Sequence, residues 1–381
     1  MEMAGARSRN PLFNANRMKL GIFGANGKGA AQTLVPEAYR PSWRNSVDTA
    51  RLADALGFEA VLAYARWKGY IAGQPTHVSG VTLDPFTWCA GIAQATRHLA
   101  VIATSHAPTL HPITAAKQCA TIDIIADGRF ALNVVGGWNK PELDMFGAAM
   151  AEHDQRYDHL EEWLNIIQRL WREEAEFDVD GRFFRVLRAS SMPKPVQQPG
   201  PPIVNAGGSD RGQRFACQHA DICFLILRSE ALDDIASQIA DYKAMARRDY
   251  GREVQVWTYA YCVQRATRAE AEDYLEHFAV RHEDGPSLDA WSAGVGSQTK
   301  ILKSPEAVRA FRKRFAAGAG GSALVGTAAD IALRLEQLAD AGLDGVLLTW
   351  VDFIDGLKRF RDVMPQIEAR GLRSPFDSAG T

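Results

Sequence analysis

The alternation of strand-like and helix-like segments constrains this chain more than any other feature. Short runs rich in Val, Ile, Leu and Phe are repeatedly followed by longer amphipathic segments. Eight runs are typical of strands, at 19–25, 59–65, 99–105, 129–136, 202–206, 222–227, 254–264 and 345–351. Helical patterns occupy 43–56, 85–96, 112–126, 156–172, 212–219, 231–249, 328–341 and 354–369. Alternation of this kind predicts an α/β fold with a parallel sheet, and eight units favour a (β/α)8 TIM barrel with insertion segments over an open sheet.

Two stretches depart from the alternation. Residues 177–186 resemble a hairpin with its turn at Asp180-Gly181. Residues 268–321 contain helical and Gly-rich pieces without a clear strand, which predicts an insertion that acts as a lid. The run Gly318-Ala-Gly-Gly321 would give this lid hinge-like freedom, although a plain loop explains the composition as well. We therefore expect one barrel domain at 19–381, with a lid at 268–321 and an N-terminal extension at 1–18.

Composition and charge narrow the possible partners. The 381 residues are 46% hydrophobic and 23% charged, with a formal net charge of −2, which is typical of a globular protein and gives no general attraction to nucleic acid or to anionic membranes. No run approaches 18 apolar residues, and the first 16 residues lack the apolar core of a secretory signal. Five widely spaced cysteines without a CxxC pair indicate reduced, buried thiols and no metal site. These features predict a cytoplasmic protein.

The run from Phe130 to Glu142, FALNVVGGWNKPE, ends an apolar strand in polar groups. Asn133 lies near the carboxyl end of this buried strand, where its amide is either a satisfied core group or a contact to a ligand. In a barrel the active site lies at the carboxyl ends of the strands. The polar groups that follow the second, third and fifth strands should therefore lie near Asn133; they are Tyr64 to Lys68, Thr104 to His106, and Asn205 to Ser209.

Gly207, Gly208 and Ser209 precede a predicted helix, so free backbone N–H groups at the helix N-terminus could bind a phosphate. The same residues would also make an ordinary helix cap. Arg156 and Tyr157 could supply a second phosphate contact, with the alternative that Arg156 is simply solvated.

Three other motifs are less specific. The segment Gly24-Ala-Asn-Gly27-Lys28-Gly29 fits neither the dinucleotide-binding motif nor the P-loop, and we interpret it as a flexible active-site loop. His106, His111 and His153 lie in or beside predicted loops, without the HxH or HExxH spacing of a metal site. No GxSxG elbow supports a serine hydrolase.

Four segments together carry a family resemblance: 130–142, His153-Asp-Gln-Arg-Tyr157, Pro193-Lys-Pro-Val-Gln-Gln-Pro199 and 205–209. The chain resembles the bacterial luciferase-like flavin monooxygenases, and among these the branch of pyrimidine oxygenase, dimethylsulfone monooxygenase and alkanesulfonate monooxygenase. The likeness runs from 19 to 227 and returns at 345–357. It implies a TIM barrel that binds reduced FMN (FMNH2), supplied by a separate NAD(P)H-dependent flavin reductase, and that reacts with O2.

The resemblance also implies roles for individual residues. Ala65 and Arg66 would lie against the flavin, Asn133 and Glu142 would hydrogen-bond it, and Thr104 would lie near its oxygen-reacting edge. The predicted 5′-phosphate site comprises Arg156, Tyr157, Gly207, Gly208 and Ser209. His106 and His153 are candidates for a proton donor or substrate contact, or are structural loop residues. We expect an apolar wall drawn from Phe23, Tyr64, Trp67 and Trp138.

The function implied is a two-component FMNH2-dependent monooxygenase that oxygenates a small organic substrate, with cleavage of a C–S, C–N or C–halogen bond. Two alternatives remain open from the residues. One is an F420-dependent oxidoreductase that transfers hydride on the same barrel, and the other is a non-catalytic flavin-binding protein. A homodimer or homotetramer is also expected from the resemblance.

Overall fold

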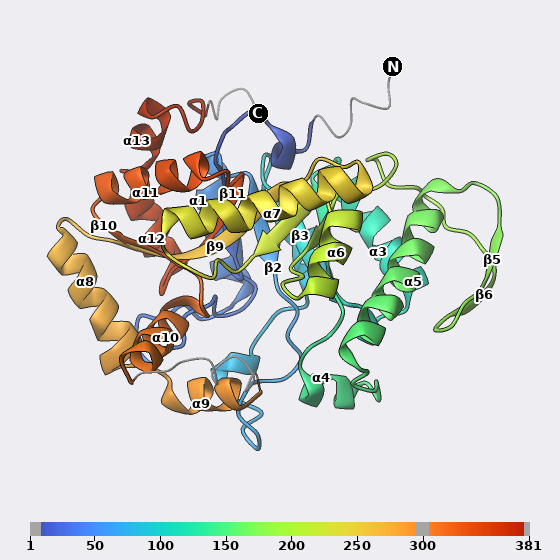
Figure 1. The fold of residues 1–381 in the computed structure, drawn as a ribbon, viewed down its shortest axis with the longest axis horizontal. Coiled ribbons are helices and arrows are strands. Elements are labelled where there is room, and N and C mark those ends of the chain that lie inside the picture. The colour runs from blue at the N-terminus through green and yellow to red at the C-terminus, as the bar shows by residue number, and fades with distance from the viewer. Residues whose placement is uncertain (1–8, 295–304, 377–381) are drawn as a thin grey trace.

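In a computed structural model that describes residues 9–294 and 305–376, eight parallel strands close into a barrel surrounded by helices (Figure 1). The barrel strands are β1 (Lys19–Phe23), β2 (Ala60–Ala63), β3 (Ala100–His106), β4 (Phe130–Val135), β7 (Ile203–Asn205), β8 (Ile222–Leu225), β9 (Gln255–Gln264) and β11 (Gly345–Thr349). β1 pairs with both β2 and β11, and β9 joins β11 to β8, so the ring is complete. The predicted (β/α)8 TIM barrel is confirmed.

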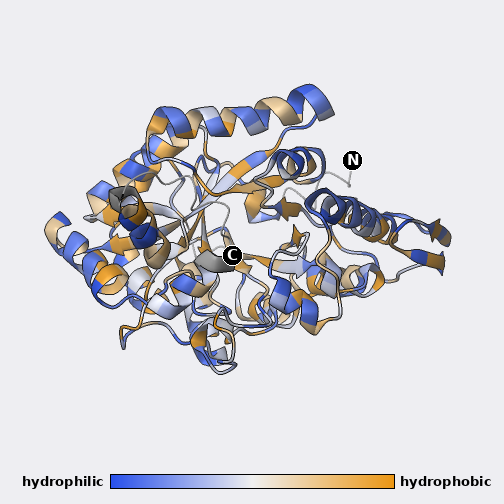
Figure 2. Cartoon of the chain, turned by 60° about the horizontal axis from the view of Figure 1, so that its bottom comes forward, coloured by the Kyte–Doolittle hydropathy of each residue, from blue (hydrophilic) through white to orange (hydrophobic). Residues whose placement is uncertain are grey.

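The outer helices follow the predicted order. They are α1 (Trp43–Ala55), α2 (Pro85–Ala95), α3 (Pro112–Ile125), α5 (His153–Arg172), α6 (Asp210–His219), α7 (Leu232–Tyr250), α11 (Ala328–Asp340), α12 (Phe353–Phe360) and α13 (Met364–Ala369). The last two replace a single predicted helix, because the chain turns at 361–363. Blue and orange segments alternate along the outer helices in Figure 2, as expected for helices with one buried face.

The N-terminal end of the barrel is closed by residues that precede β1. A short 3₁₀ helix, η2 (Pro11–Phe13), places Leu12 fully buried in the cluster that fills the barrel interior. The Asn10 amide donates to Gln197 Oε1 at 3.0 Å, and Gln255 Nε2 donates to the Leu12 carbonyl at 2.8 Å. The described part of the predicted 1–18 extension, from residue 9 onward, is therefore packed into the barrel.

The segment between β9 and β11 is mostly helical. It contains α8 (Arg268–Glu276), a π-helix η5 (His277–Arg281), α9 (Gly285–Gly294) and α10 (Pro305–Gly318), while residues 295–304 of the predicted lid lie outside the described residues. A ninth parallel strand that the sequence did not predict, β10 (Ser322–Gly326), follows α10 and precedes α11, and it pairs with Ala260–Gln264 of β9.

The glycine run at the end of this segment has a packing role. A Cβ at Gly318 would lie 2.8 Å from the Cβ of Tyr261, and one at Gly321 would lie 2.8 Å from the ring of Tyr259. The glycines thus let the chain approach two tyrosines of β9, which accounts for the composition without a hinge.

The remaining elements lie outside the barrel wall. The predicted hairpin is confirmed as β5 (Phe177–Asp180) and β6 (Arg185–Ala189), which project away from the barrel in Figure 1. A short unpredicted helix, α4 (Lys140–Met145), follows β4. All five cysteines are buried and free, as expected. In the described ranges we find no helix with the length and apolar character needed to cross a membrane.

Candidate active site

A cavity of about 610 Å³ opens at the carboxyl ends of the strands. Five of the predicted site residues line it, namely Ala65, Arg66, Thr104, His106 and Asn133. Among the aromatic residues expected in its wall, Phe23, Tyr64 and Trp138 also contribute. Trp67 does not line it; this side chain is partly exposed and packs against Phe146 at 5.3 Å between ring centroids.

Thr104 and Asn133 lie opposite each other on neighbouring strands, because β3 and β4 pair in that register. Asn133 Nδ2 donates to Thr104 Oγ1 at 3.0 Å, and both side chains are buried. This hydrogen bond fixes the amide so that Asn133 Oδ1 is left without a protein donor among the described residues. A ligand N–H group could satisfy that acceptor.

Glu142 links two other predicted residues. Its Oε1 accepts hydrogen bonds from the backbone N–H groups of Trp67 and Lys68, at 3.0 and 3.3 Å, which ties α4 to the loop after β2. Arg66 Nη1 lies 3.7 Å from Glu142 Oε1, and His106 Nδ1 lies 3.6 Å from Glu142 Oε2. All three side chains are almost fully buried. Arg66 and His106 line the cavity, and Glu142 does not line it but contacts both of them.

Burial, reinforced by the nearby positive charge of Arg66, lowers the pKa of His106 to about 4. The imidazole is therefore neutral at pH 7. At this pH it can donate or accept a hydrogen bond, but it cannot supply a proton as an imidazolium ion.

Four of the predicted phosphate residues, Tyr157, Gly207, Gly208 and Ser209, lie at the N-terminus of α6. Ser209 is the N-cap, and its Oγ accepts from the Gly212 backbone N–H at 3.1 Å. Gly207 contacts Gly212 so closely that a Cβ would lie 2.2 Å from the Gly212 carbonyl oxygen, whereas a Cβ at Gly208 would enter open space. The N–H groups of the first helical turn have no partner within a helix, and these small residues leave room for an anion beside them.

Tyr157 and the remaining predicted phosphate residue, Arg156, belong to the beginning of α5. Burial raises the pKa of Tyr157, and its hydrogen bond with Ser209 opposes the increase. Arg156 Nη1 donates to the Gly137 carbonyl at 2.7 Å, while its buried Nε has no protein acceptor in the described ranges. His153 Nε2 lies 3.0 Å from Ser209 Oγ. His153 is half-exposed and does not line the cavity, so it lies with the predicted phosphate residues rather than near Thr104.

Several cavity residues were not singled out from the sequence. Trp291 of α9 and Phe311, Arg314 and Phe315 of α10 line the cavity, and no periodicity in this segment indicated that they would. Lys28 also lines it, and the Gly-rich motif after β1 did draw attention to this position.

The turn that carries Lys28 differs from the flexible loop that was expected. Its residues 24–29 are buried, and Gly27 and Gly29 both donate backbone hydrogen bonds to the Gly24 carbonyl. This packing makes it an ordered part of the cavity wall.

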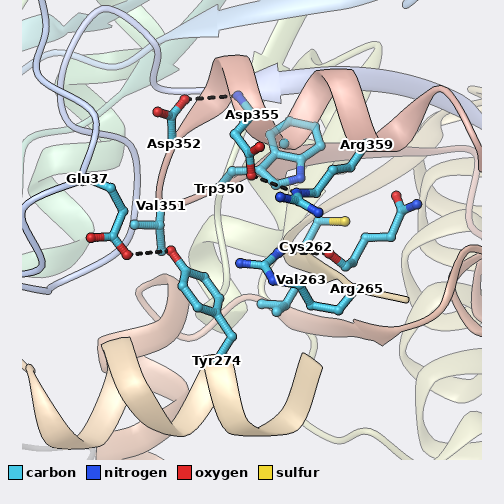
Figure 3. Close-up of a pocket in the computed structure, with 12 residues that line it drawn as sticks. Glu37, Cys262, Val263, Arg265, Tyr274, Trp350, Val351, Asp352, Asp355 and Arg359 are labelled. Atoms are coloured by element: carbon cyan, nitrogen blue, oxygen red, sulfur yellow. Dashed lines mark hydrogen bonds and ion pairs between the residues drawn. The ribbon is translucent and has the colours of Figure 1, made fainter. Parts of the chain in front are cut away.

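A second cavity of about 250 Å³ lies between α8, α12 and the ends of β9 and β11 (Figure 3). Tyr274 faces Glu37 across it, and Asp355 pairs with Arg359 at 2.7 Å. It contains none of the predicted site residues, and its charged side chains largely satisfy one another.

The main cavity suits a flavin ring, and the residues predicted to bind the phosphate of FMN lie outside its lining. Two lining residues carry a buried polar atom with no hydrogen-bond partner among the described residues, Asn133 Oδ1 and Arg66 Nη1, and so does Glu142 at Oε2, behind Arg66 and His106. A flavin ring presents alternating donors and acceptors along one edge, which matches such a mixed set. The α6 N-terminus with Ser209, Tyr157 and Arg156 suits the terminal phosphate.

Comparison with known proteins gives the family. The model of the luciferase-like monooxygenase family matches residues 18–345. The pyrimidine monooxygenase RutA of Enterobacter sp. (strain 638) is 30% identical over 369 residues, which cover 93% of this chain and 97% of that protein. Two solved structures share the fold. They are the long-chain alkane monooxygenase LadA (TM-score 0.80, 23% identity, 96% of this chain and 94% of that one) and DmoA from Hyphomicrobium sulfonivorans (TM-score 0.81, 19% identity, 95% and 90%). The chain therefore belongs to the luciferase-like monooxygenase family and is a flavin-dependent monooxygenase.

Proposed function

We propose that this protein is the oxygenase component of a two-component system. It would take FMNH2 from a separate NAD(P)H-dependent flavin reductase and use O2 to oxygenate a small organic substrate, with cleavage of a C–S, C–N or C–halogen bond. Reduced FMN, when bound, supplies the two electrons with which one atom of O2 enters the substrate and the other leaves as water. We further propose that the protein is cytoplasmic and forms a homodimer or homotetramer.

One observation carries the choice of FMN. The unpartnered Asn133 Oδ1 and Arg66 Nη1 belong to residues that line the cavity, and Glu142, whose Oε2 is also unpartnered among the described residues, contacts Arg66. The proposed anion site at α6 follows β7, the strand that pairs with β4. A ligand with a hydrogen-bonding ring at one end and a phosphate at the other would satisfy both places. A cavity of about 610 Å³ falls in the range of cofactor and substrate sites.

In this proposal one group of residues binds the phosphate of FMN and another orients the flavin ring. Arg156, Tyr157 and Ser209, with the backbone of Gly207 and Gly208, hold the phosphate. Asn133, Arg66 and Glu142 orient the ring, and the Ala65 methyl packs against it.

Other residues act beside the ring. Thr104 holds the amide of Asn133 and stands beside the reacting edge. Neutral His106 is available as a hydrogen-bond partner for substrate, and the aromatic wall excludes water.

The proposal is tested by anaerobic titration of the protein with photoreduced FMN, followed by admission of O2. Tight binding of FMNH2 and substrate-stimulated oxygen consumption are expected. Binding of reduced F420 without oxygen consumption would instead indicate hydride transfer, and FMN binding with no substrate-stimulated oxidation would indicate a flavin-binding protein.

The lid is a separate part of the proposal. Trp291, Phe311 and Phe315 come from the segment 268–321 and cover the cavity, so displacement of this segment would open it. Limited proteolysis should cut the segment in the free protein, and FMNH2 with substrate should suppress the cut. Equal cutting in both states would contradict a lid.

A further inference from the structure

Lys28 is a buried cation whose hydrogen bonds are incomplete. Its side chain is 8% exposed, and Nζ donates to the Ala31 carbonyl and to Gln32 Oε1, both at 2.7 Å. An ammonium group has three N–H donors. Both partners are neutral, and among the described residues no carboxylate lies within 4.0 Å of Nζ. One donor and the full positive charge therefore remain available to the cavity that Lys28 lines.

The position of this ammonium is fixed by its neighbours. Gln32 Nε2 donates to the Ala30 carbonyl, and Gln32 Oε1 also accepts from Ser287 Oγ at 3.1 Å. The Gln32 amide is thus held by two segments far apart in the sequence, the turn after β1 and helix α9. Lys28 in turn is held by Gln32, so its charge is presented at a defined point of the wall.

The cavity wall has an unbalanced charge. Four cationic side chains line it, those of Lys28, Arg66, Arg228 and Arg314, and within the described part of the chain no Asp or Glu side chain does. Arg66 has Glu142 at 3.7 Å, and Arg314 has Glu230 at 3.6 Å. In the described ranges neither Lys28 nor Arg228 has such an ion pair, but Arg228 is exposed to solvent whereas Lys28 is buried. Lys28 is therefore the cation on this wall that most needs an anion.

Aromatic rings line the same cavity as Lys28. Trp291 follows Ser287 by four residues on α9, and therefore lies one turn from the contact with Gln32 on the same helix face. Its ring stacks on Phe315. Deeper in the cavity, Phe23 stacks with Tyr259 and Tyr64, with ring centroids 5.1 and 5.9 Å apart. Flat apolar surfaces beside a fixed cation suit a planar ring with an acidic substituent.

We propose that Lys28 determines substrate specificity by binding an oxyanion, and that the substrate is a small planar molecule bearing a carboxylate. This assignment rests on the proposed function, because it takes the space beyond the flavin ring as the substrate site. It adds a recognition group that is not among the predicted flavin contacts.

The protonation of Lys28 agrees with this role. Burial lowers its pKa to about 8, with Asp284 opposing the decrease from a distance and Arg66 reinforcing it. The side chain is still mostly protonated at pH 7. Asp284 itself is engaged by the Ser287 N–H and by His77. A bound carboxylate would compensate the buried charge and stabilise the protonated form.

The test uses flavin-free protein and matched pairs of planar ligands that differ only in charge: benzoate with benzamide, and orotate with orotamide. Saturation-transfer NMR and calorimetric titration measure binding to the wild type. At least one carboxylate should bind more tightly than its amide. Lys28→Met should weaken that carboxylate about 10- to 100-fold and leave its amide within about twofold.

Two further variants separate charge from architecture. Lys28→Arg should retain most of the preference for the carboxylate. Gln32→Glu keeps Lys28 but places a carboxylate beside its Nζ, and it should abolish the preference as Lys28→Met does. If Lys28→Met does not fold, Gln32→Glu tests the same proposal, because it neutralises the effect of the Lys28 charge without removing the side chain.

The outcomes are distinct. Equal carboxylate affinity in wild type and Lys28→Met, or no carboxylate preference in the wild type, would overturn the assignment. FMNH2 titration of the same proteins reports independently on the cofactor. Lys28-dependent carboxylate binding in a protein that does not bind FMNH2 would leave the ligand site standing and reject the proposed function, and the converse result would reject only the ligand site.

Discussion

Asn133 Nδ2 donates a 3.0 Å hydrogen bond to Thr104 Oγ1 across the β3–β4 pair. This contact leaves the side-chain oxygen of Asn133, Oδ1, without a protein donor among the described residues, on a residue that lines the cavity. The amide could otherwise rotate and present its NH2 group to a ligand. The threonine hydroxyl therefore decides which end of the amide the cofactor meets.

Thr104→Val keeps the side-chain shape and removes the acceptor of this bond. A buried donor left unsatisfied costs about 1–3 kcal/mol, so the free energy of unfolding in urea should fall by that amount. FMNH2 affinity should also fall. Thr104→Ser restores the hydroxyl and is the control. A Thr104→Val protein with wild-type stability and affinity would mean that Thr104 does not orient the amide.

Arg156→Ala should weaken FMN binding by about 2–3 kcal/mol, because it removes a charge-assisted contact to the phosphate. Riboflavin has no phosphate, and its affinity should be unchanged in the variant. Arg172→Ala, at the far end of the same helix, is the matched control. Equal losses for FMN and riboflavin would place Arg156 at some other part of the ligand.

Gly212→Ala should impair the phosphate site through sterics alone. The added Cβ would lie 2.3 Å from the Tyr157 hydroxyl and 2.9 Å from Gly207 Cα, so both must move. We expect at least a tenfold loss of FMN affinity by fluorescence titration. Gly285→Ala introduces the same methyl at the start of α9 where the closest contact is 3.6 Å, and it should bind FMN as the wild type does. Normal FMN affinity in Gly212→Ala would argue against this site.

We expect the free energy of unfolding to decrease at acid pH because of buried His106. Its pKa is about 4 in the folded protein and about 6.5 when exposed, so between these values the unfolded chain binds the additional proton. The stabilisation is complete above pH 6.5 and is lost as the pH falls toward 4, by about 3 kcal/mol in total. His106→Gln should remove this contribution. Other groups titrate in both proteins, so the difference between their unfolding free energies at pH 7 and pH 4.5 isolates His106. Parallel curves would contradict a neutral buried imidazole.

Much of the barrel could be predicted because it depends on local patterns. Apolar runs such as Phe130–Val135 are buried on both faces, and capping residues such as Ser209 mark where helices begin. The ninth strand was missed because Ser322–Gly326 is short, follows a glycine run and gains its strand geometry from the edge of β9.

The site could be predicted only in part, because some of its residues reach the cavity through tertiary packing rather than through a local sequence pattern. Asn133 and Thr104 sit at strand ends, where topology alone brings them together. Trp291 and Phe315 reach the cavity through the tertiary packing of α9 and α10, which no sequence period encodes. The sequence left open whether His153 is a proton donor, a substrate contact or a structural residue. Its contact with Ser209 could not be predicted locally, because the two residues are 56 positions apart.

The ladder of β9 has an evolutionary consequence. The helical segment leaves this strand after Gln264 and returns in β10, whose last residue, Gly326, pairs with Gln264 again. Both ends of this segment are thus attached to β9, because it leaves after Gln264 and re-enters the sheet at Ser322, which pairs with Ala260. Exchange of the segment would change the part of the cavity wall that comes from Trp291, Phe311 and Phe315. The residues proposed to bind the flavin lie on other elements and would stay the same. A protein with this architecture can change its substrate by replacement of one segment, while the barrel fold stays the same.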